Sequence, residues 1–194
     1  MNGRLFVVVL VQTLVLLAMI SLRQWTLATG IPVILETQPV DPRSLFSGDY
    51  VRLNYKVSDL RLEELAGDRL FKRHDTVFVV LARDDESGGE YWRAVSVHRD
   101  RPRPGDGQAV IKGSVEYTGD TIWDAVRNKA VEVKHLHVKY GIEDYFVQEG
   151  SGRELERPKQ DEKVSIQVAV DRFGNAGIKA VLVNGRPKFI ETLL

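Results

Sequence analysis

The sequence predicts a mainly β protein in which one N-terminal transmembrane helix precedes a single antiparallel β-barrel or β-sandwich domain with one or two short helices. An uncharged apolar run opens the chain at residues 5–22. About seven or eight short segments of alternating apolar and polar residues follow at hairpin spacing, separated by Gly, Pro, Asn and Asp. The domains are therefore expected to be an anchor over residues 1–25 and an extracytoplasmic β domain over residues 26–194.

The run from Leu5 to Leu22 carries only Gln12, Thr13 and Ser21 as polar residues. A helix of this length extends roughly 27 Å, which is close to the thickness of the hydrocarbon layer of a bilayer. The alternative is a cleaved signal peptide, whose apolar region is shorter and is followed by small residues at the cleavage site. Because Arg23-Gln24-Trp25 follows instead, we prefer an uncleaved signal-anchor in the lipid bilayer.

The orientation in the membrane is predicted from a small charge bias. Arg4 and the terminal amine precede the helix, and Arg23 follows it. A short tail before a first membrane helix most simply stays in the cytoplasm. The β domain is therefore expected on the periplasmic or extracellular side.

The first half of the β domain is expected to mix strands with a short helix. A strand over residues 32–40 ends at Asp41-Pro42, and a second strand over residues 49–57 alternates its side chains between two faces. Ser58 is placed to cap a helix of about two turns over residues 59–66, and Gly67 is placed to end it.

Most of the remaining chain is expected to form strands. A helical turn is predicted at residues 123–126, and Asn184-Gly185 is a signal for a type I′ hairpin. The arginine-containing loop 99–107 is interpreted as solvated surface in preference to a phosphate or lipid-headgroup contact. The predicted strands are 76–82, 90–98, 109–117, 131–140, 163–171, 177–183 and 186–190.

Two sequence blocks carry a resemblance to a known family. The first is Gly-Asp-Tyr-Val-Arg-Leu-Asn-Tyr at residues 48–55, and the second is Tyr-Gly-Ile-Glu-Asp-Tyr-Phe-Val-Gln-Glu-Gly at residues 140–150, followed by Gly-Arg-Glu-Leu-Glu at 152–156. The chain resembles the GDYXXLXY family in both blocks and over most of its length. Members of that family are membrane proteins without an established activity, and some are joined to polytopic membrane regions. The resemblance implies an accessory or binding role beside a membrane-protein partner.

We expect the two blocks to meet in space and to form a polar-aromatic binding patch. Asp49 begins a strand on its buried side, so it needs a partner such as Arg43 or the backbone amides of the preceding turn. The alternative is that Asp49, Glu143 and Glu149 are structural hydrogen-bond acceptors. The expected patch consists of Arg43, Asp49, Tyr50, Tyr55, Tyr140, Glu143, Tyr145 and Glu149.

Composition and motifs exclude several other classes of function. The 27 basic and 27 acidic residues balance, so nothing favours binding to nucleic acid, and the absence of cysteine excludes disulfides and thiolate sites. No phosphate-binding glycine motif is present, so no cofactor is expected. His135-x-His137 is the only metal-like spacing; because a third ligand is not assigned, although Glu143 and Asp144 are candidates, we expect no metal site.

No catalytic residue is predicted, and a binding module is preferred to an enzyme. Leu45-Phe46-Ser47-Gly48-Asp49-Tyr50-Val51 resembles a segment of the type I signal peptidases, as does Pro104-Gly105-Asp106. Val40 occupies the position expected for their nucleophilic serine, and the position of their general base falls near Trp92-Arg93, where an arginine cannot act as a neutral base. A carboxylate-dependent hydrolase and a catalytically inactive signal-peptidase-like domain stay open as alternatives.

Overall fold

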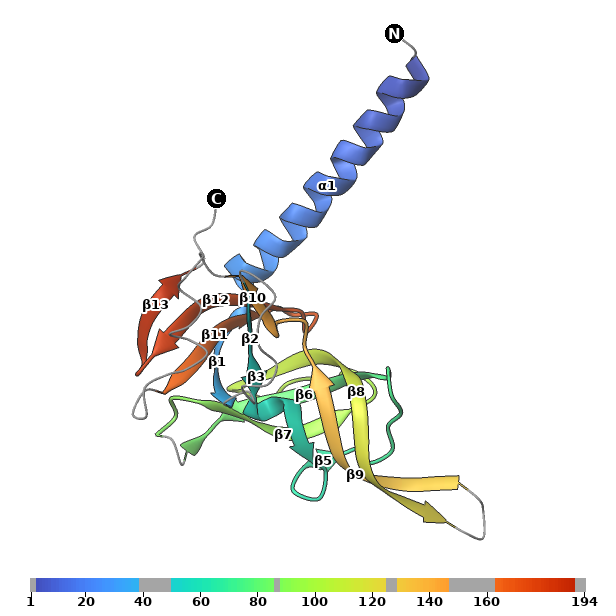
Figure 1. Cartoon of the computed structure of the whole chain (residues 1–194), viewed down its shortest axis with the longest axis vertical. Helices are drawn as coiled ribbons and strands as arrows, with labels where there is room; N and C mark the ends of the chain where they lie inside the picture. Colours follow the sequence, from blue (N-terminus) through green and yellow to red (C-terminus); the bar gives the residue numbers. More distant parts are fainter. Residues whose placement is uncertain (1–2, 39–49, 86–87, 125–128, 147–162, 191–194) are drawn as a thin grey trace.

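The structure, a computed structural model, describes residues 3–38, 50–85, 88–124, 129–146 and 163–190. One long helix projects from a domain built of curled β-sheets (Figure 1). The prediction of a mainly β protein with a single N-terminal helix of membrane-spanning character is thus confirmed.

Helix α1 spans Gly3–Thr29, and it is long and apolar enough to cross a membrane. Its side chains are exposed from Gly3 through Leu22, as expected for a surface that lipid would cover. The helix continues beyond residue 25, where the anchor was expected to end. Thr26 and Leu27 are buried against the β domain, so the last turn of the helix is part of the folded domain.

The first sheet contains five strands in the order β13-β12-β11-β1-β3. Strand β1 pairs antiparallel with β11 and places Val33 opposite Val168, and both side chains are fully buried. Strand β3 adds to this sheet through two pairs at the end of β1. The bounds are β1 (Ile31–Gln38), β3 (Asn54–Tyr55), β11 (Val164–Val170), β12 (Ala176–Val183) and β13 (Arg186–Ile190).

The second sheet contains six strands in the order β4-β9-β8-β6-β7-β5. All neighbours are antiparallel except β5 and β7. Both sheets contribute to one hydrophobic core, in which Leu35 and Ile166 lie with Val79 and Ile111. The bounds are β4 (Asp59–Arg61), β5 (Ala66–Gly67), β6 (Thr76–Arg83), β7 (Trp92–His98), β8 (Gln108–Asp124) and β9 (Lys129–Lys139).

The helix predicted over residues 59–66 is wrong. A 3₁₀-turn, η1 (Lys56–Ser58), precedes strand β4, which pairs Leu60 with Leu136 of β9. Leu60 and Leu62 are both buried. Side chains two residues apart share a face in a strand and not in a helix, so burial of this pair selects the extended conformation.

The helical turn predicted at residues 123–126 is also wrong where the structure describes it. Trp123 and Asp124 continue strand β8 and pair with Ala130 and Lys129 of β9. The other two residues of that prediction, 125 and 126, lie outside the described residues.

Candidate functional site

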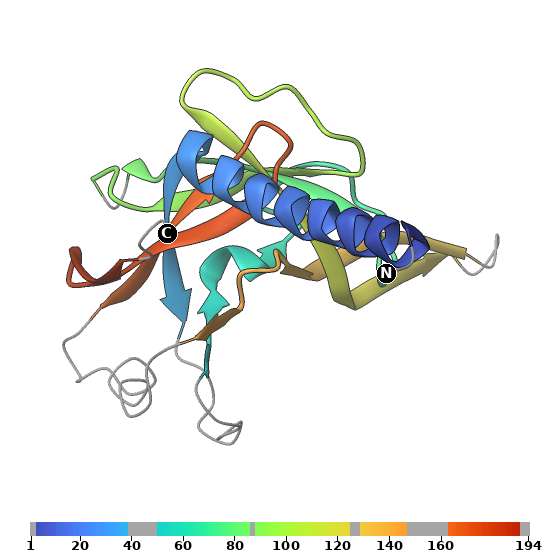
Figure 2. The same cartoon turned by 90° about the horizontal axis from the view of Figure 1, so that it is seen from above.

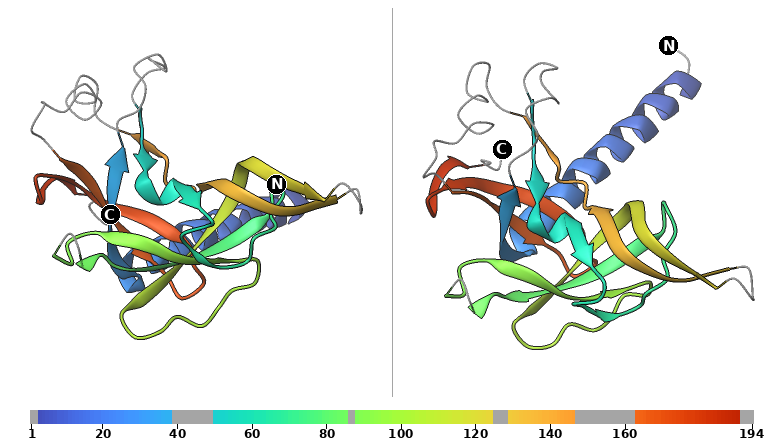
Figure 3. Two further views of the ribbon diagram at one scale, coloured as in Figure 1. Left: turned by 90° about the horizontal axis from the view of Figure 1, so that it is seen from below. Right: turned by 60° about the horizontal axis from the view of Figure 1, so that its bottom comes forward.

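The two sequence blocks lie side by side as paired strands. Strand β2 (Tyr50–Arg52) pairs antiparallel with β10 (Asp144–Phe146), and this register places Val51 opposite Tyr145 (Figure 3). The backbone contact continues past the ends of these two strands, because the Leu53 N–H donates to the Glu143 carbonyl oxygen at 2.6 Å. We call this contact between the blocks the block junction.

Two tyrosines cross the block junction in opposite directions. The Tyr55 hydroxyl donates to the Ile142 carbonyl oxygen at 2.5 Å, and the Tyr140 hydroxyl donates to the Val57 carbonyl oxygen at 2.5 Å. Burial, together with the nearby Glu143 carboxylate, raises the pKa of both phenols well above the ordinary value. The hydroxyls therefore stay protonated, as hydrogen-bond donors must.

Glu143 stabilises the turn that begins the second block. Its two carboxylate oxygens accept hydrogen bonds from the Tyr140 N–H at 2.6 Å and from the Gly141 N–H at 2.9 Å. Gly141 has a φ of 77°, a left-handed conformation that glycine adopts without steric cost. The Tyr-Gly-Ile-Glu sequence is thus a turn whose own side chain satisfies its backbone amides.

The other predicted site residues either lie in the paired strands or fall outside the described residues. The backbone of Tyr50 pairs within β2, and Tyr145 is buried in β10. Arg43, Asp49 and Glu149 lie outside the described residues. Because the rings of Tyr55, Tyr140 and Tyr145 are buried, they contact the interior of the fold, and the surface next to the junction is formed by other side chains.

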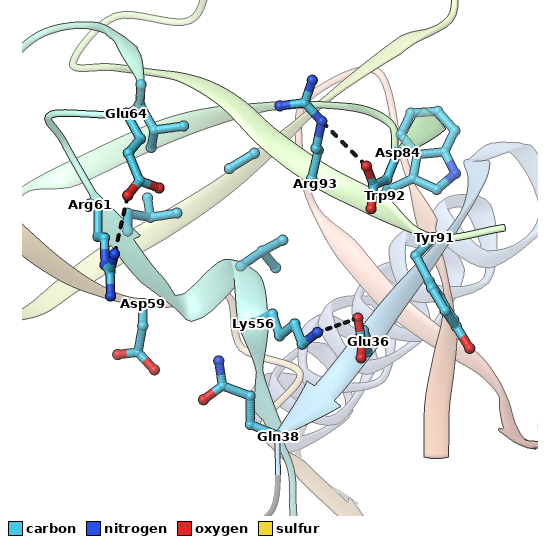
Figure 4. A pocket seen from close by; sticks show the side chains of 14 residues that line it. Glu36, Gln38, Lys56, Asp59, Arg61, Glu64, Asp84, Tyr91, Trp92 and Arg93 are labelled. Carbon is cyan, nitrogen blue, oxygen red and sulfur yellow. Dashed lines mark hydrogen bonds and ion pairs between the residues drawn. The ribbon is translucent and has the colours of Figure 1, made fainter. Parts of the chain in front are cut away.

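That surface is a groove of about 340 Å³ between β1 and η1 on one side and the start of β7 on the other (Figure 4). It was not predicted, because its walls come from segments that the fold brings together. Lys56 and Val57, which directly follow the first block, line one wall, and Tyr91 and Trp92 line the other. We call it the β1–β7 groove.

The charged side chains that line the β1–β7 groove include both signs, in pairs. Lys56 lies 2.7 Å from Glu36, a second pair joins Arg61 and Glu64 at 3.2 Å, and the third pair, Arg93 and Asp84, is longer at 3.6 Å. These pairs are partly exposed, so each contributes little to stability and can exchange its partner at small cost.

Strand β7 presents a partly unpaired edge to this groove. It pairs with β6 from Trp92 to His98, but its other edge pairs with β5 only at Ser96 and Val97. No other described strand pairs with β7, and residues 91–94 line the groove. An open strand edge is a template for the backbone of another extended chain.

The two histidines that share the metal-like spacing point to separate carboxylates. The His135 Nδ1 lies 2.9 Å from Asp120, and the His137 Nδ1 lies 2.5 Å from Asp59. The His137 ring also stacks on Tyr117 at a centroid distance of 4.7 Å. Across the described ranges, no group of three His, Asp or Glu side chains is arranged to hold a metal ion.

An N-terminal helix long and apolar enough to cross a membrane, fused to a curled β domain with two paired sequence blocks, defines the class of protein. The chain belongs to the GDYXXLXY family: the family model described as GDYXXLXY protein matches residues 12–181. No curated protein and no solved structure matches the chain. These comparisons do not show the resemblance to signal peptidases.

Proposed function

We propose that this chain is a membrane-anchored binding module that holds an extended segment of a membrane-protein partner in the β1–β7 groove. The observation that carries the proposal is the open edge of β7 at residues 92–94, which lines a groove beside the block junction. In this proposal the junction fixes one wall, since Lys56 and Val57 follow the Tyr55 anchor directly. The polar-aromatic surface is then formed by residues beside the two blocks.

The chemistry of the groove fits a polypeptide that carries charges of both signs. Backbone hydrogen bonds to a strand edge supply affinity that does not depend on sequence, and side-chain contacts supply specificity. Lys56, Arg61 and Arg93 offer cations, and their partly exposed acidic partners offer anions. The half-buried Tyr91, next to the start of the same strand, adds ring surface.

Permanent attachment of the domain to a membrane is part of the proposal. The contacts of the last helical turn support an uncleaved anchor: the Thr26 hydroxyl donates to Asp171 at 2.7 Å, and Leu27 is 7 % exposed. Cleavage near the end of α1 would remove both from the domain. We place the β domain on the periplasmic or extracellular side, because the short N-terminal tail most simply stays in the cytoplasm.

Site-specific photocrosslinking in native membranes tests the groove. A photoreactive amino acid at Ala94 lies in the groove, and one at Asp106 lies in an exposed loop that does not line it. We expect position 94 to give a discrete adduct with a membrane protein, and position 106 to give none.

Charge reversal provides the matched specificity test. Arg93→Glu in the groove is expected to reduce the adduct at position 94 at least about tenfold, which corresponds to about 1.4 kcal/mol of binding free energy. Arg101→Glu, at another exposed arginine, is the control and should leave the adduct unchanged. An adduct at position 94 that is insensitive to Arg93→Glu, with both variants folded, would contradict the proposal.

A further inference from the structure

The β domain is held directly against the end of the membrane helix. Gly30 alone separates α1 from β1. Arg23 of α1 donates to the Ala176 carbonyl oxygen at 3.3 Å, one helical turn before the hydrogen bond from Thr26 to Asp171. Figure 2 shows α1 leaving the domain next to the β11–β12 hairpin.

These contacts fix how far the domain stands from the lipid. Thr26 is four residues beyond Leu22, the last residue of the apolar run, and four residues advance a helix by about 6 Å. The polar headgroup layer on each side of a bilayer is roughly 5–8 Å thick. The contacts that Arg23 and Thr26 make with the β domain therefore fall within the headgroup layer, on whichever side the domain lies.

Two exposed apolar side chains lie close to these contacts. Outside α1, the described part of the chain exposes three large hydrophobic side chains: Ile31 at 47 %, Tyr117 at 53 % and Phe173 at 55 %. Ile31 begins β1 opposite Val170. Phe173 lies in the β11–β12 turn, and its N–H donates to Asp171 at 2.8 Å. Two of the three thus lie beside the residues that contact the helix.

Cationic groups accompany these apolar side chains. The Arg172 guanidinium lies 4.8 Å from the centre of the Phe173 ring. Lys112 of β8 lies next to the turn, because its backbone N–H donates to the Gly174 carbonyl oxygen at 2.8 Å. Aromatic rings favour the membrane interface, and basic side chains near it are attracted to anionic phospholipids.

We propose that the β11–β12 turn is a second membrane contact, in which Phe173 enters the headgroup layer and Arg172 binds lipid phosphate. The occupant is the phospholipid surface, since this surface continues from α1 at the depth that the helix sets. The inference is independent of the β1–β7 groove.

The absence of cysteine from the chain makes a direct test practical. The full-length protein with Phe173→Cys is labelled with an environment-sensitive nitrobenzoxadiazole dye and reconstituted into phosphatidylcholine vesicles that contain a headgroup spin-labelled lipid. The matched control is Asp85→Cys, an exposed residue of the β6–β7 turn. This turn lies on the side of the domain opposite α1 in Figure 1.

We expect spin-labelled lipid to quench the dye at position 173 at least about twofold more than the dye at position 85. Vesicles with phosphatidylglycerol should increase the quenching at 173, and Arg172→Glu in the Phe173→Cys background should remove this increase. Equal quenching at both positions would overturn the proposal. A dye at 173 that is shielded from water but not quenched would indicate a protein contact, and it would overturn the proposal as well.

Discussion

The Tyr55 hydroxyl and the Ile142 carbonyl oxygen, 87 residues apart in the chain, are joined by a buried 2.5 Å hydrogen bond. The bond gives the first sequence block a structural role, since Tyr55 and Leu53 pack in the core while β2 pairs with β10. Tyr140 makes the reverse contact with Val57. The two blocks therefore form one joint, which holds the paired residues of both blocks together.

Tyr55→Phe is expected to destabilise the domain by about 1–2 kcal/mol, because it leaves a buried carbonyl oxygen without its donor. Thermal unfolding of the detergent-solubilised protein should show a Tm lower by roughly 2–8 °C. Tyr117→Phe is the control. Because the Tyr117 side chain is 53 % exposed, the Tm of this variant should equal that of the unsubstituted protein. Equal Tm values for Tyr55→Phe and the unsubstituted protein would show that the bond contributes nothing.

Glu143→Gln is expected to cost about 1–3 kcal/mol in free energy of unfolding. A glutamine has one acceptor oxygen, so it cannot accept from the N–H groups of both Tyr140 and Gly141 with separate oxygens, as the carboxylate does. Denaturant unfolding measures the loss. Glu64→Gln, at an exposed ion pair, should leave the midpoint unchanged, and a similar midpoint shift in both variants would argue against a specific role for Glu143.

Gly30→Ala is expected to destabilise the joint between α1 and β1 by about 1–3 kcal/mol. An added Cβ would lie 2.7 Å from the Thr26 carbonyl oxygen and 2.9 Å from the Val170 nitrogen, and neither backbone atom can move independently. Gly119→Ala is the control, since its Cβ would meet only the His135 Cβ at 3.4 Å. Protease protection of the segment after α1 should fall in the first variant alone.

The stability of the helix–domain contact should depend on acid pH through Asp171. Burial acts to raise the pKa of this carboxyl, but the hydrogen bonds from Thr26, Asn175 and the backbone amides of Phe173 and Asn175 outweigh it and lower the pKa. A lowered folded-state pKa gives stability that is complete above the unfolded value of about 3.9 and is lost as the pH falls through the folded value.

Comparison of the unsubstituted protein with Asp171→Asn isolates this effect. The difference in free energy of unfolding should be constant above about pH 5 and should shrink below about pH 4, where the carboxylate is progressively protonated. Denaturant titrations from about pH 6 down to about pH 2 measure the difference. A difference that does not vary with pH would exclude a contribution from the ionised carboxylate.

Much of the architecture follows from local patterns. The apolar run predicts α1, and alternation predicts strands such as β11 and β12, whose paired positions bury Ile166 and Val181. Local sequence patterns predicted the wrong conformation where pairing with a strand distant in the sequence determines it. Ser58 and Gly67 resemble helix boundaries, but pairing with β9 holds residues 59–61 between them in an extended conformation.

The candidate site could be predicted from the sequence less completely than the fold. The meeting of the two blocks was expected, and alternation along residues 49–57 predicts that the Tyr55 ring faces the core, where it lies. Burial of Tyr140 and Tyr145 was not expected, because the β2–β10 pairing is not encoded in local spacing. The β1–β7 groove combines side chains from four separate segments. Asp171 was missed as an organising residue, although an Asp that begins an Asp-Arg-Phe-Gly-Asn turn is a recognised signal for side-chain capping of a turn.

The single glycine between α1 and β1 has a consequence for partner choice. A domain joined so tightly cannot swing as it would on a flexible linker, so the position and orientation of the β1–β7 groove relative to α1 are fixed. Under the proposed function, a partner segment reaches the groove only if it leaves the same bilayer at a matching height. Lateral diffusion and effective concentration in the plane of the membrane, more than affinity in solution, would then decide which membrane protein binds.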